Sequence, residues 1–405
     1  MRLTDFKYLI YVPSFHGFAT FLFFYICYFL GIIEYNNCDN YTHLIYITCI
    51  FFFLISSFLF VNRFKTRLQN TYVSNFTCNF YDSVTMRRYV YIFYAIGNLG
   101  FVLYLQKVIS FFGGVSIFLA ILLSEDSTQI RIESDNFSDS IGIQLSYFSW
   151  IAAAISLIVL RQSKNKKKYI ALIVFTFLQN VLFIDRTRPM WIILTLLISV
   201  FPFSHRKISN VKVVLTTFFL GVGFYGLFSI IAVLAGKSLT EKQFKGWDIS
   251  PSAQNFIYYG TSSFAYFNNM VENEEIDSFK LDRTVYPLLK ITSSLGITDQ
   301  PSSLVNDFYF IPSPTNVGTF LEPFYRDGGF LFVFFGMFFH SVILNALGVF
   351  FLKNANPFGL FAYANICYVN LMAFFTPKIN NFPIWLFLTL GIYFMIYLKK
   401  KLKTN

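Results

Sequence analysis

The sequence predicts an all-α polytopic membrane protein with about 10 transmembrane helices and one large external loop, and two observations favour this class. Of the 405 residues, 55% are hydrophobic and only 13% are charged, about half the charged fraction of a typical soluble protein. A water-soluble fold would have to expose much of this apolar surface, whereas in lipid the same side chains face hydrocarbon. Apolar stretches close to the length of a spanning helix also recur along the chain. We therefore expect a single integral membrane domain over residues 1–405.

The predicted spans are ten apolar segments, some of them short for a bilayer-crossing helix. They cover residues 8–33, 44–62, 89–106, 141–160, 169–184, 189–203, 211–235, 329–352, 357–375 and 383–398. An eleventh apolar run, 108–123, is interrupted by Gly113 and Gly114. Counting it as a span would break the charge pattern described next. We predict that it is re-entrant or interfacial, inside an external segment over residues 107–140.

The basic residues set the predicted orientation, because loops on the cytoplasmic side carry an excess of Lys and Arg. With the amino terminus inside, one side of the membrane collects 20 of the 32 basic residues and only two acids, Asp5 and Asp82, for a net charge of +18. The opposite side has a net charge of −7. Both termini are therefore expected in the cytoplasm. The basic character of the chain is explained by topology, and no nucleic-acid partner is implied.

Most of the residues expected outside the membrane lie in one loop, residues 236–328, between the predicted spans seven and eight. A connection of 93 residues is usually functional or disordered, and its many Tyr, Phe, Ile and Leu residues argue against disorder. We expect amphipathic helices around 252–271 and 284–296 to lie against the membrane surface.

The short link FIDRTRPMW (183–191) carries Asp185, Arg186 and Arg188 at the expected external membrane face. Arginine there opposes the charge bias, and a charge close to hydrocarbon costs a few kcal/mol. Arginine is well suited to phosphate because its planar guanidinium is permanently charged. One interpretation is therefore a clamp for a lipid-linked diphosphate. The alternative is a helix-end anchor in which Asp185 pairs with an arginine that extends to water.

A second group of polar residues lies in SPTNVGTFLEPFYRDGG (313–329), which closes the large loop. Glu322, Tyr325, Arg326 and Asp327 fall within six residues, and on a helix Glu322 and Arg326 are neighbours at i, i+4. A carboxylate there can act as a general base, and the arginine can stabilise a departing phosphate. The alternative is a salt bridge at a helix start, followed by a glycine hinge.

Other residues and motifs give weaker indications of function. Arg283 and Lys290 in the large loop either contact anionic lipid or sugar, or are simply solvated. The five cysteines show no metal-ligand spacing. The sequence contains no P-loop, HExxH or GxSxG motif, so a primary pump or an ordinary hydrolase is unsupported. We predict no metal site and no cofactor.

This layout and the segment PTNVGTFLEPFYRDGGFLFVFFGMFFH resemble the Wzy-type O-antigen and oligosaccharide repeat-unit polymerases. The likeness lies in an Asn-Val pair, a few aromatic residues, an acidic residue and glycines ahead of a glycine-containing span. It also lies in the central arginine-bearing turn and the single large external loop. The architecture is similar to that of lipid-dependent (GT-C-like) glycosyltransferases and O-antigen ligases.

The resemblance implies an activity that composition does not show. Such enzymes join oligosaccharide units carried on undecaprenyl diphosphate at the periplasmic face of the bacterial inner membrane. They use no nucleotide sugar or metal, and work with a flippase and a chain-length co-polymerase. In this sequence the substrate contacts fall on Arg186, Arg188 and Arg326, with Arg283 as a further candidate. The base that deprotonates the acceptor hydroxyl is then Glu322 or Asp327.

Three alternatives remain open from the sequence. An O-antigen ligase is expected to use a histidine in its large external loop, and residues 236–328 contain none. A lipid-linked oligosaccharide flippase is expected to have more spans, short loops, internal repeats and charges inside its spans. A non-catalytic assembly subunit is the third alternative.

Overall fold

A computed structural model of the chain describes most of its residues. These are 8–35, 39–74, 84–122, 140–160, 163, 165–183, 187–200, 223, 225–226, 228–230, 243–277, 280–304, 306–353 and 356–404. Arg186 and nearly all of the predicted span 211–235 lie outside the described residues.

The described chain is mainly helical. Its first half forms α1 (Pro13–Phe29), α2 (Asn40–Ser74), α3 (Val84–Phe111), α4 (Val115–Leu122), α6 (Ile141–Ser146), α7 (Phe148–Leu160), α8 (Lys166–Val181) and α9 (Thr187–Val200). Its second half forms α11 (Pro251–Glu272), α12 (Tyr286–Ser294), α13 (Glu322–Phe338), the π-helical segment η5 (Phe339–Ile343), α14 (Leu344–Lys353), α15 (Pro357–Leu371), the 3-10 turn η6 (Lys378–Asn380) and α16 (Phe382–Thr404). Two short strands, β1 (Tyr309–Phe310) and β2 (Pro314–Thr315), pair antiparallel, with Tyr309 opposite Thr315.

Within the described residues, four helical stretches are long and apolar enough to cross a membrane. They are Asn40–Arg63, Val84–Phe111, Ile141–Leu160 and Glu322–Leu352, and they match the predicted segments 44–62, 89–106, 141–160 and 329–352. Two shorter apolar helices, Thr187–Ser199 and Phe382–Leu398, match two further predicted segments. The fold is thus consistent with an all-α membrane protein.

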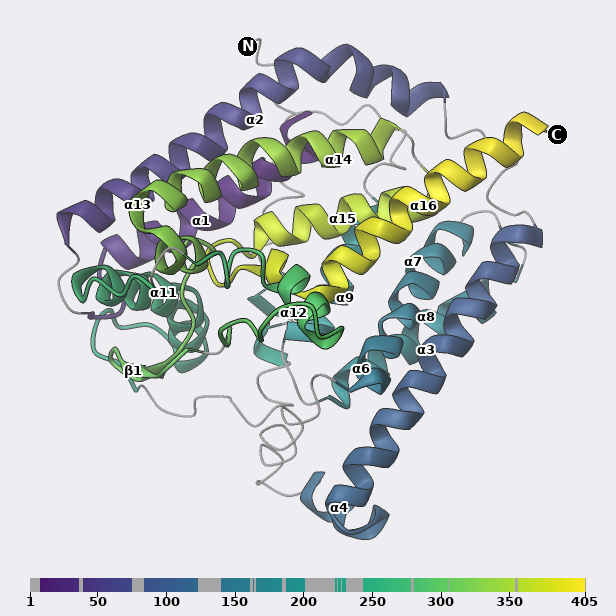
Figure 1. Cartoon of the computed structure of the whole chain (residues 1–405), viewed down its shortest axis with the longest axis horizontal. Helices are drawn as coiled ribbons and strands as arrows, with labels where there is room; N and C mark the ends of the chain where they lie inside the picture. The colour runs from purple at the N-terminus through teal and green to yellow at the C-terminus, as the bar shows by residue number, and fades with distance from the viewer. Residues whose placement is uncertain are drawn as a thin grey trace.

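The apolar run 108–123 breaks at its glycine pair, as the sequence predicts. α3 ends at Phe111 and α4 begins at Val115. Between them, φ is +82° at Gly113 and +131° at Gly114, and glycine adopts such positive values without the steric cost that other residues meet. Figure 1 shows α4 as a separate short helix at the end of α3.

Helix α15 lies at the centre of the bundle. It packs against α1, α9, α14 and α16, which separate it from the outside (Figure 1). Asn356 caps its first turn by accepting a bond from the Gly359 amide at 2.9 Å, and Pro357 occupies the first helical position. Every residue from Pro357 to Asn370 is buried. A helix that is apolar on all sides is buried in this way.

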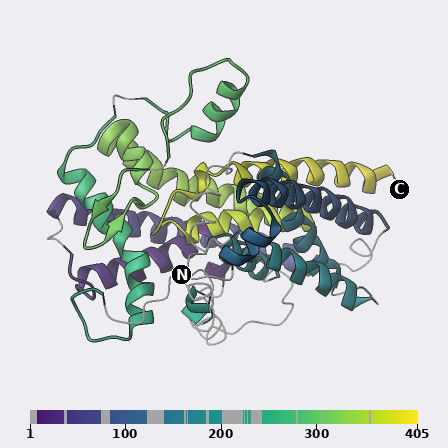
Figure 2. The ribbon, with the colours of Figure 1, turned by 90° about the horizontal axis from the view of Figure 1, so that it is seen from below.

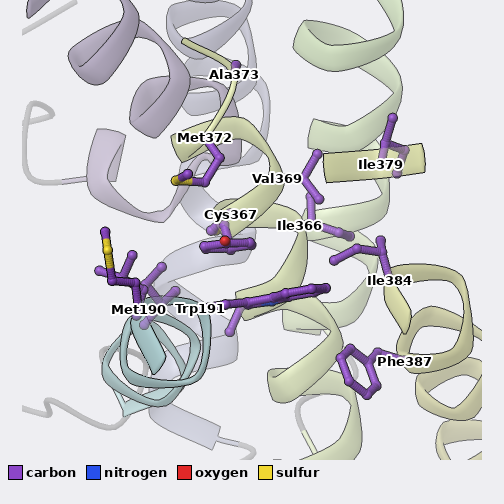
Figure 3. Packing of buried hydrophobic residues seen from close by; sticks show 14 of the residues in the cluster. Met190, Trp191, Ile366, Cys367, Val369, Met372, Ala373, Ile379, Ile384 and Phe387 are labelled. Atoms are coloured by element: carbon purple, nitrogen blue, oxygen red, sulfur yellow. The ribbon is translucent and has the colours of Figure 1, made fainter. Parts of the chain in front are cut away.

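Aromatic side chains fill the space between α9 and α15. The ring of Trp191 stacks on Tyr368 with centroids 5.1 Å apart, and its Nε1 donates to Asn365 Oδ1 at 2.9 Å. Figure 3 shows Trp191 of α9 extending towards Ile384 and Phe387, with Met190 on the other side of α9. The indole N–H thus has a hydrogen-bond partner inside the core, as a buried tryptophan requires.

On the other side of the bundle, α3 packs directly on α6 and α7. Two glycines of α3 permit this approach. A Cβ at Gly97 would lie 2.4 Å from the Ser149 nitrogen, and one at Gly100 would lie 2.5 Å from the Ser146 nitrogen. Small residues at helix interfaces allow such close backbone contact in membranes.

The expectation for 252–271 was wrong, because α11 is not a surface helix. Ser250 caps it, and 14 of its 22 residues are buried. α11 packs on α1, where Gly260 leaves room for the ring of Phe24. Its aromatic face therefore has a protein partner and does not need lipid. Helix α12, by contrast, projects from the side of the bundle (Figure 2).

Candidate functional site

The predicted acidic and basic residues of the 313–329 segment lie on the first turns of α13, before a kink. Gly328 and Gly329 interrupt the helical backbone, and Gly329 has φ +62° and ψ −151°, a conformation essentially restricted to glycine. The turn Glu322–Asp327 folds back along the rest of α13, because the ring of Phe324 packs directly against the backbone of Gly336. The kink therefore places a charged turn beside the apolar helix that follows, and not in line with it.

Arg326 is held by two carboxylates and a phenol. Its Nη2 lies 2.8 Å from Glu275 Oε2, and its Nε lies 3.2 Å from Glu322 Oε1. Nη2 also donates to the Tyr266 hydroxyl at 3.2 Å. Burial raises the pKa of Tyr266 to about 12, and the positive charge of Arg326 acts in the opposite direction. Tyr266 is therefore a neutral hydrogen-bonding partner at physiological pH.

Arg283 approaches the same Glu322 from the other side. Its Nη1 lies 3.5 Å from Glu322 Oε1 and donates to Asn306 Oδ1 at 2.8 Å. Its Nε lies 3.1 Å from Asp277 Oδ2. The Glu322 side chain is only 6% exposed, so one buried carboxylate lies between two arginines. We call Arg283, Arg326, Glu275, Asp277, Glu322 and Asp327 the charged cluster.

Asp327 has a different role in the charged cluster. Its carboxylate accepts bonds from the backbone amides of Arg283, at 3.2 Å to each oxygen, and of Thr284, at 2.7 Å. The residue is fully buried. Asn380, in η6, donates to the Arg283 carbonyl at 2.8 Å. Asp327 therefore fixes the backbone that carries Arg283, and its oxygens are already occupied.

The structure thus brings together four of the six residues predicted for the site: Arg283, Glu322, Arg326 and Asp327. The i, i+4 pair predicted between Glu322 and Arg326 is present, but it belongs to a larger network that an isolated salt bridge at a helix start would lack. Arg188, near the start of α9, lies among aromatic rings. Its guanidinium lies 4.3 Å from the ring centroid of Phe183 and 5.8 Å from that of Tyr147.

Sequence reasoning missed Glu275, Asp277, Tyr266 and Asn306. One signal was present: the loop 236–328 contains seven Lys and Arg residues against 11 Asp and Glu residues. Because acidic residues outnumber basic ones in this loop, its arginines are expected to pair with carboxylates and not to be surrounded by water alone. Lys378, in the link between α15 and α16, is also buried and was not among the predicted residues.

No family model, curated protein or solved structure matches this chain. The chemistry of the site therefore rests on its own geometry. The charged cluster holds two permanent cations and four carboxylates, an excess of two negative charges when all are ionised. Its two most exposed carboxylates are Asp277, at 45%, and Glu275, at 25%. An incoming anion can replace these acids on the arginines more easily than it can replace Glu322.

Proposed function

We propose that this chain polymerises undecaprenyl-diphosphate-linked oligosaccharide repeat units into O-antigen or a related surface polysaccharide. The observation that carries the proposal is the position of Glu322 between Arg283 and Arg326, directly before an apolar helix. Glycosyl transfer from a lipid diphosphate needs cations for the leaving group and a base for the attacking hydroxyl. Both groups occur in the charged cluster.

In this proposal the arginines bind the diphosphate by exchanging partners. Glu275 and Asp277 are partly exposed, so on release their carboxylates regain hydration, which offsets part of the lost attraction to the arginines. Glu322 is buried and keeps its place between the two guanidinium groups. Diphosphate oxygens then take the positions that Glu275 and Asp277 occupy.

The bond changes follow from these positions. The acceptor hydroxyl oxygen forms a bond to the anomeric carbon of the donor sugar, and the bond from that carbon to the diphosphate oxygen breaks. The diphosphate leaves with the electron pair, and Arg283 and Arg326 stabilise its charge. Glu322 receives the hydroxyl proton. Asp327 keeps Arg283 in place through the two backbone amides.

The proposal includes a topology and partners. In the proposed topology the chain has ten spans, with both termini in the cytoplasm and residues 236–328 in the periplasm. The charged cluster then faces the periplasmic side of the inner membrane. A flippase supplies the lipid-linked unit, and a co-polymerase sets chain length. The clustering of residues from 236–328 with the start of the eighth span supports this arrangement.

The experiment is deletion of the gene in its host, followed by complementation and gel analysis of surface polysaccharide. The variants are Glu322→Gln, Arg326→Gln and Arg283→Gln, with Asp282→Asn as the matched control. Asp282 lies next to Arg283 but outside the charged cluster, and its carboxylate accepts a bond from Ser302 at the surface. Membrane abundance and unfolding temperature of each variant are measured in parallel.

We expect the deletion to leave lipopolysaccharide with a single repeat unit. Wild type and Asp282→Asn restore the ladder of gel bands that correspond to increasing numbers of repeat units. The variants that fold but do not restore it are Glu322→Gln, Arg326→Gln and Arg283→Gln. If deletion also removes the single-unit band, a ligase or a flippase is the better assignment. If folded cluster variants restore the ladder, the proposed site is wrong. Arg188→Gln, tested separately, reports whether the aromatic-bound arginine takes part.

A further inference from the structure

Helix α12 presents an apolar face that is open in the described structure. Leu288, Ile291 and Leu295 are 62%, 42% and 69% exposed, and their spacing of three and four residues places them on one side of the helix. Ile297, just beyond the helix, is also 69% exposed. Four large aliphatic side chains thus lie together outside the helix bundle.

The base of α12 is fixed to the charged cluster. The amides of Arg283 and Thr284, immediately before the helix, bind the Asp327 carboxylate. Asp327 directly precedes the kink at Gly328 and Gly329. From this point α12 extends to the side of the bundle, as Figure 2 shows.

The outward-facing surface of α13 begins at this kink, directly after Gly328 and Gly329. After the kink, large side chains on α13 are between 44% and 72% exposed: Phe330, Leu331, Phe334, Phe335 and Phe338. They belong to the candidate span Glu322–Leu352, so in a membrane this surface faces lipid. Ile276, 45% exposed, lies against the kink, because a Cβ at Gly329 would be 3.2 Å from its Cδ1. The base of α12 and the start of the outward-facing surface of α13 are therefore joined through Asp327 and the kink that follows it.

We propose that α12 is an interfacial helix whose Leu288, Ile291 and Leu295 face, together with Ile297, inserts into the bilayer leaflet next to the charged cluster. A lipid surface fits better than a protein partner, because a stable protein interface buries about 800 Å² on each side and involves about 20 residues or more. An amphipathic helix needs only its apolar face to insert between lipid headgroups. The inference uses the membrane character of the chain and is independent of the proposed enzymatic activity.

The test measures the surroundings of two faces of α12 in the full-length protein. Cys38 and Cys78 are first replaced by Ser; Cys27, Cys49 and Cys367 are buried. Single cysteines are then introduced as Leu295→Cys, on the apolar face, and as Ser293→Cys, two positions earlier and so about 200° away around the helix. Each is labelled with an environment-sensitive fluorophore, and the protein is placed in nanodiscs of phosphatidylethanolamine and phosphatidylglycerol.

We expect the probe at Leu295→Cys to be quenched by brominated acyl chains and shielded from aqueous iodide. The probe at Ser293→Cys should show the reverse. Equal iodide quenching at both positions without quenching by lipid overturns the proposal. Shielding at Leu295→Cys that disappears when the nanodisc holds a single copy of the chain points to a second copy, and also overturns it. If Leu295→Cys fails to fold, Ile291→Cys provides the same comparison.

Discussion

The charged cluster predicts that losing an arginine destabilises the fold more than losing the carboxylate between the arginines. The paired changes are Arg326→Gln and Glu322→Gln, which place the same neutral side chain at each position and each remove one charge. With four carboxylates and two arginines in the cluster, the first change raises the excess of negative charge from two to three. The second lowers it from two to one.

The magnitudes follow from the distances. At an effective dielectric constant of 20, pairs at 3.2 Å and 3.5 Å each have a Coulomb energy of about 5 kcal/mol, which desolvation largely offsets. Arg326→Gln leaves Glu322 buried beside Arg283 alone, so the expected loss is about 3–5 kcal/mol, as for one partner removed from a buried pair. Glu322→Gln leaves each arginine a carboxylate, Glu275 at 2.8 Å or Asp277 at 3.1 Å. Its expected loss is about 1–3 kcal/mol.

The assay is thermal unfolding in detergent, followed with a thiol-reactive dye that reports exposure of the buried Cys27, Cys49 and Cys367. We expect the unfolding temperature to fall in the order wild type, Glu322→Gln, Arg326→Gln. The double variant should lose less than the two single losses added together, because it also removes the buried carboxylate that Arg326→Gln leaves with one arginine. If Glu322→Gln is the less stable single variant, or the two losses simply add, the electrostatic account of the cluster is wrong.

Three further predictions concern neighbouring parts of the site. Asp327→Asn removes charge-assisted bonds to two amides, worth about 1.5–3 kcal/mol each, so limited proteolysis should cut the chain around α12 faster. Gly329→Ala forces a side chain into a glycine conformation against Ile276, and the unfolding free energy should fall by about 1–3 kcal/mol. His340 is fully buried beside the Asn370 side chain, and within the described residues neither ring nitrogen makes a hydrogen bond of good geometry. His340→Leu should therefore leave thermal stability unchanged or raise it by up to about 3 kcal/mol.

Each of these predictions has a control or a contrary outcome. Asp299→Asn, at an exposed position beyond α12, should leave proteolysis unchanged. Gly226→Ala, where nothing in the described part of the chain lies within 4 Å of the added methyl group, should not destabilise the protein. Loss of stability in His340→Leu would show that the imidazole has a polar partner, such as an internal water.

Sequence reasoning succeeded where one contiguous stretch contains the signal. The four candidate spans match predicted apolar segments because length and composition suffice to find them. The Glu322–Arg326 pair follows from helical spacing alone. The break at Gly113 and Gly114 was found because two adjacent glycines interrupt an apolar run.

It failed where the answer depends on which segments meet in space. Arg283 joins the cluster through the amide bonds to Asp327, 44 positions away, and no local pattern contains that contact. α11 was assigned to the membrane surface because its aromatic residues suit a lipid interface and a packed core equally well. The partners Glu275 and Asp277 were missed for the same reason as Arg283.

The enclosed position of α15 has a consequence for how the chain is assembled. A membrane protein is inserted helix by helix, and each new segment first meets lipid before it finds its neighbours. α15 carries Asn365 and Asn370 with no exposed surface, so it gains little from lipid and much from helices already in place. Its neighbours α1, α9 and α14 all precede it in the chain, and α16 follows directly. We therefore expect biogenesis to finish with α15 docking into a preformed groove that α16 then closes. Truncation before α16 should leave a chain that membrane quality-control proteases degrade.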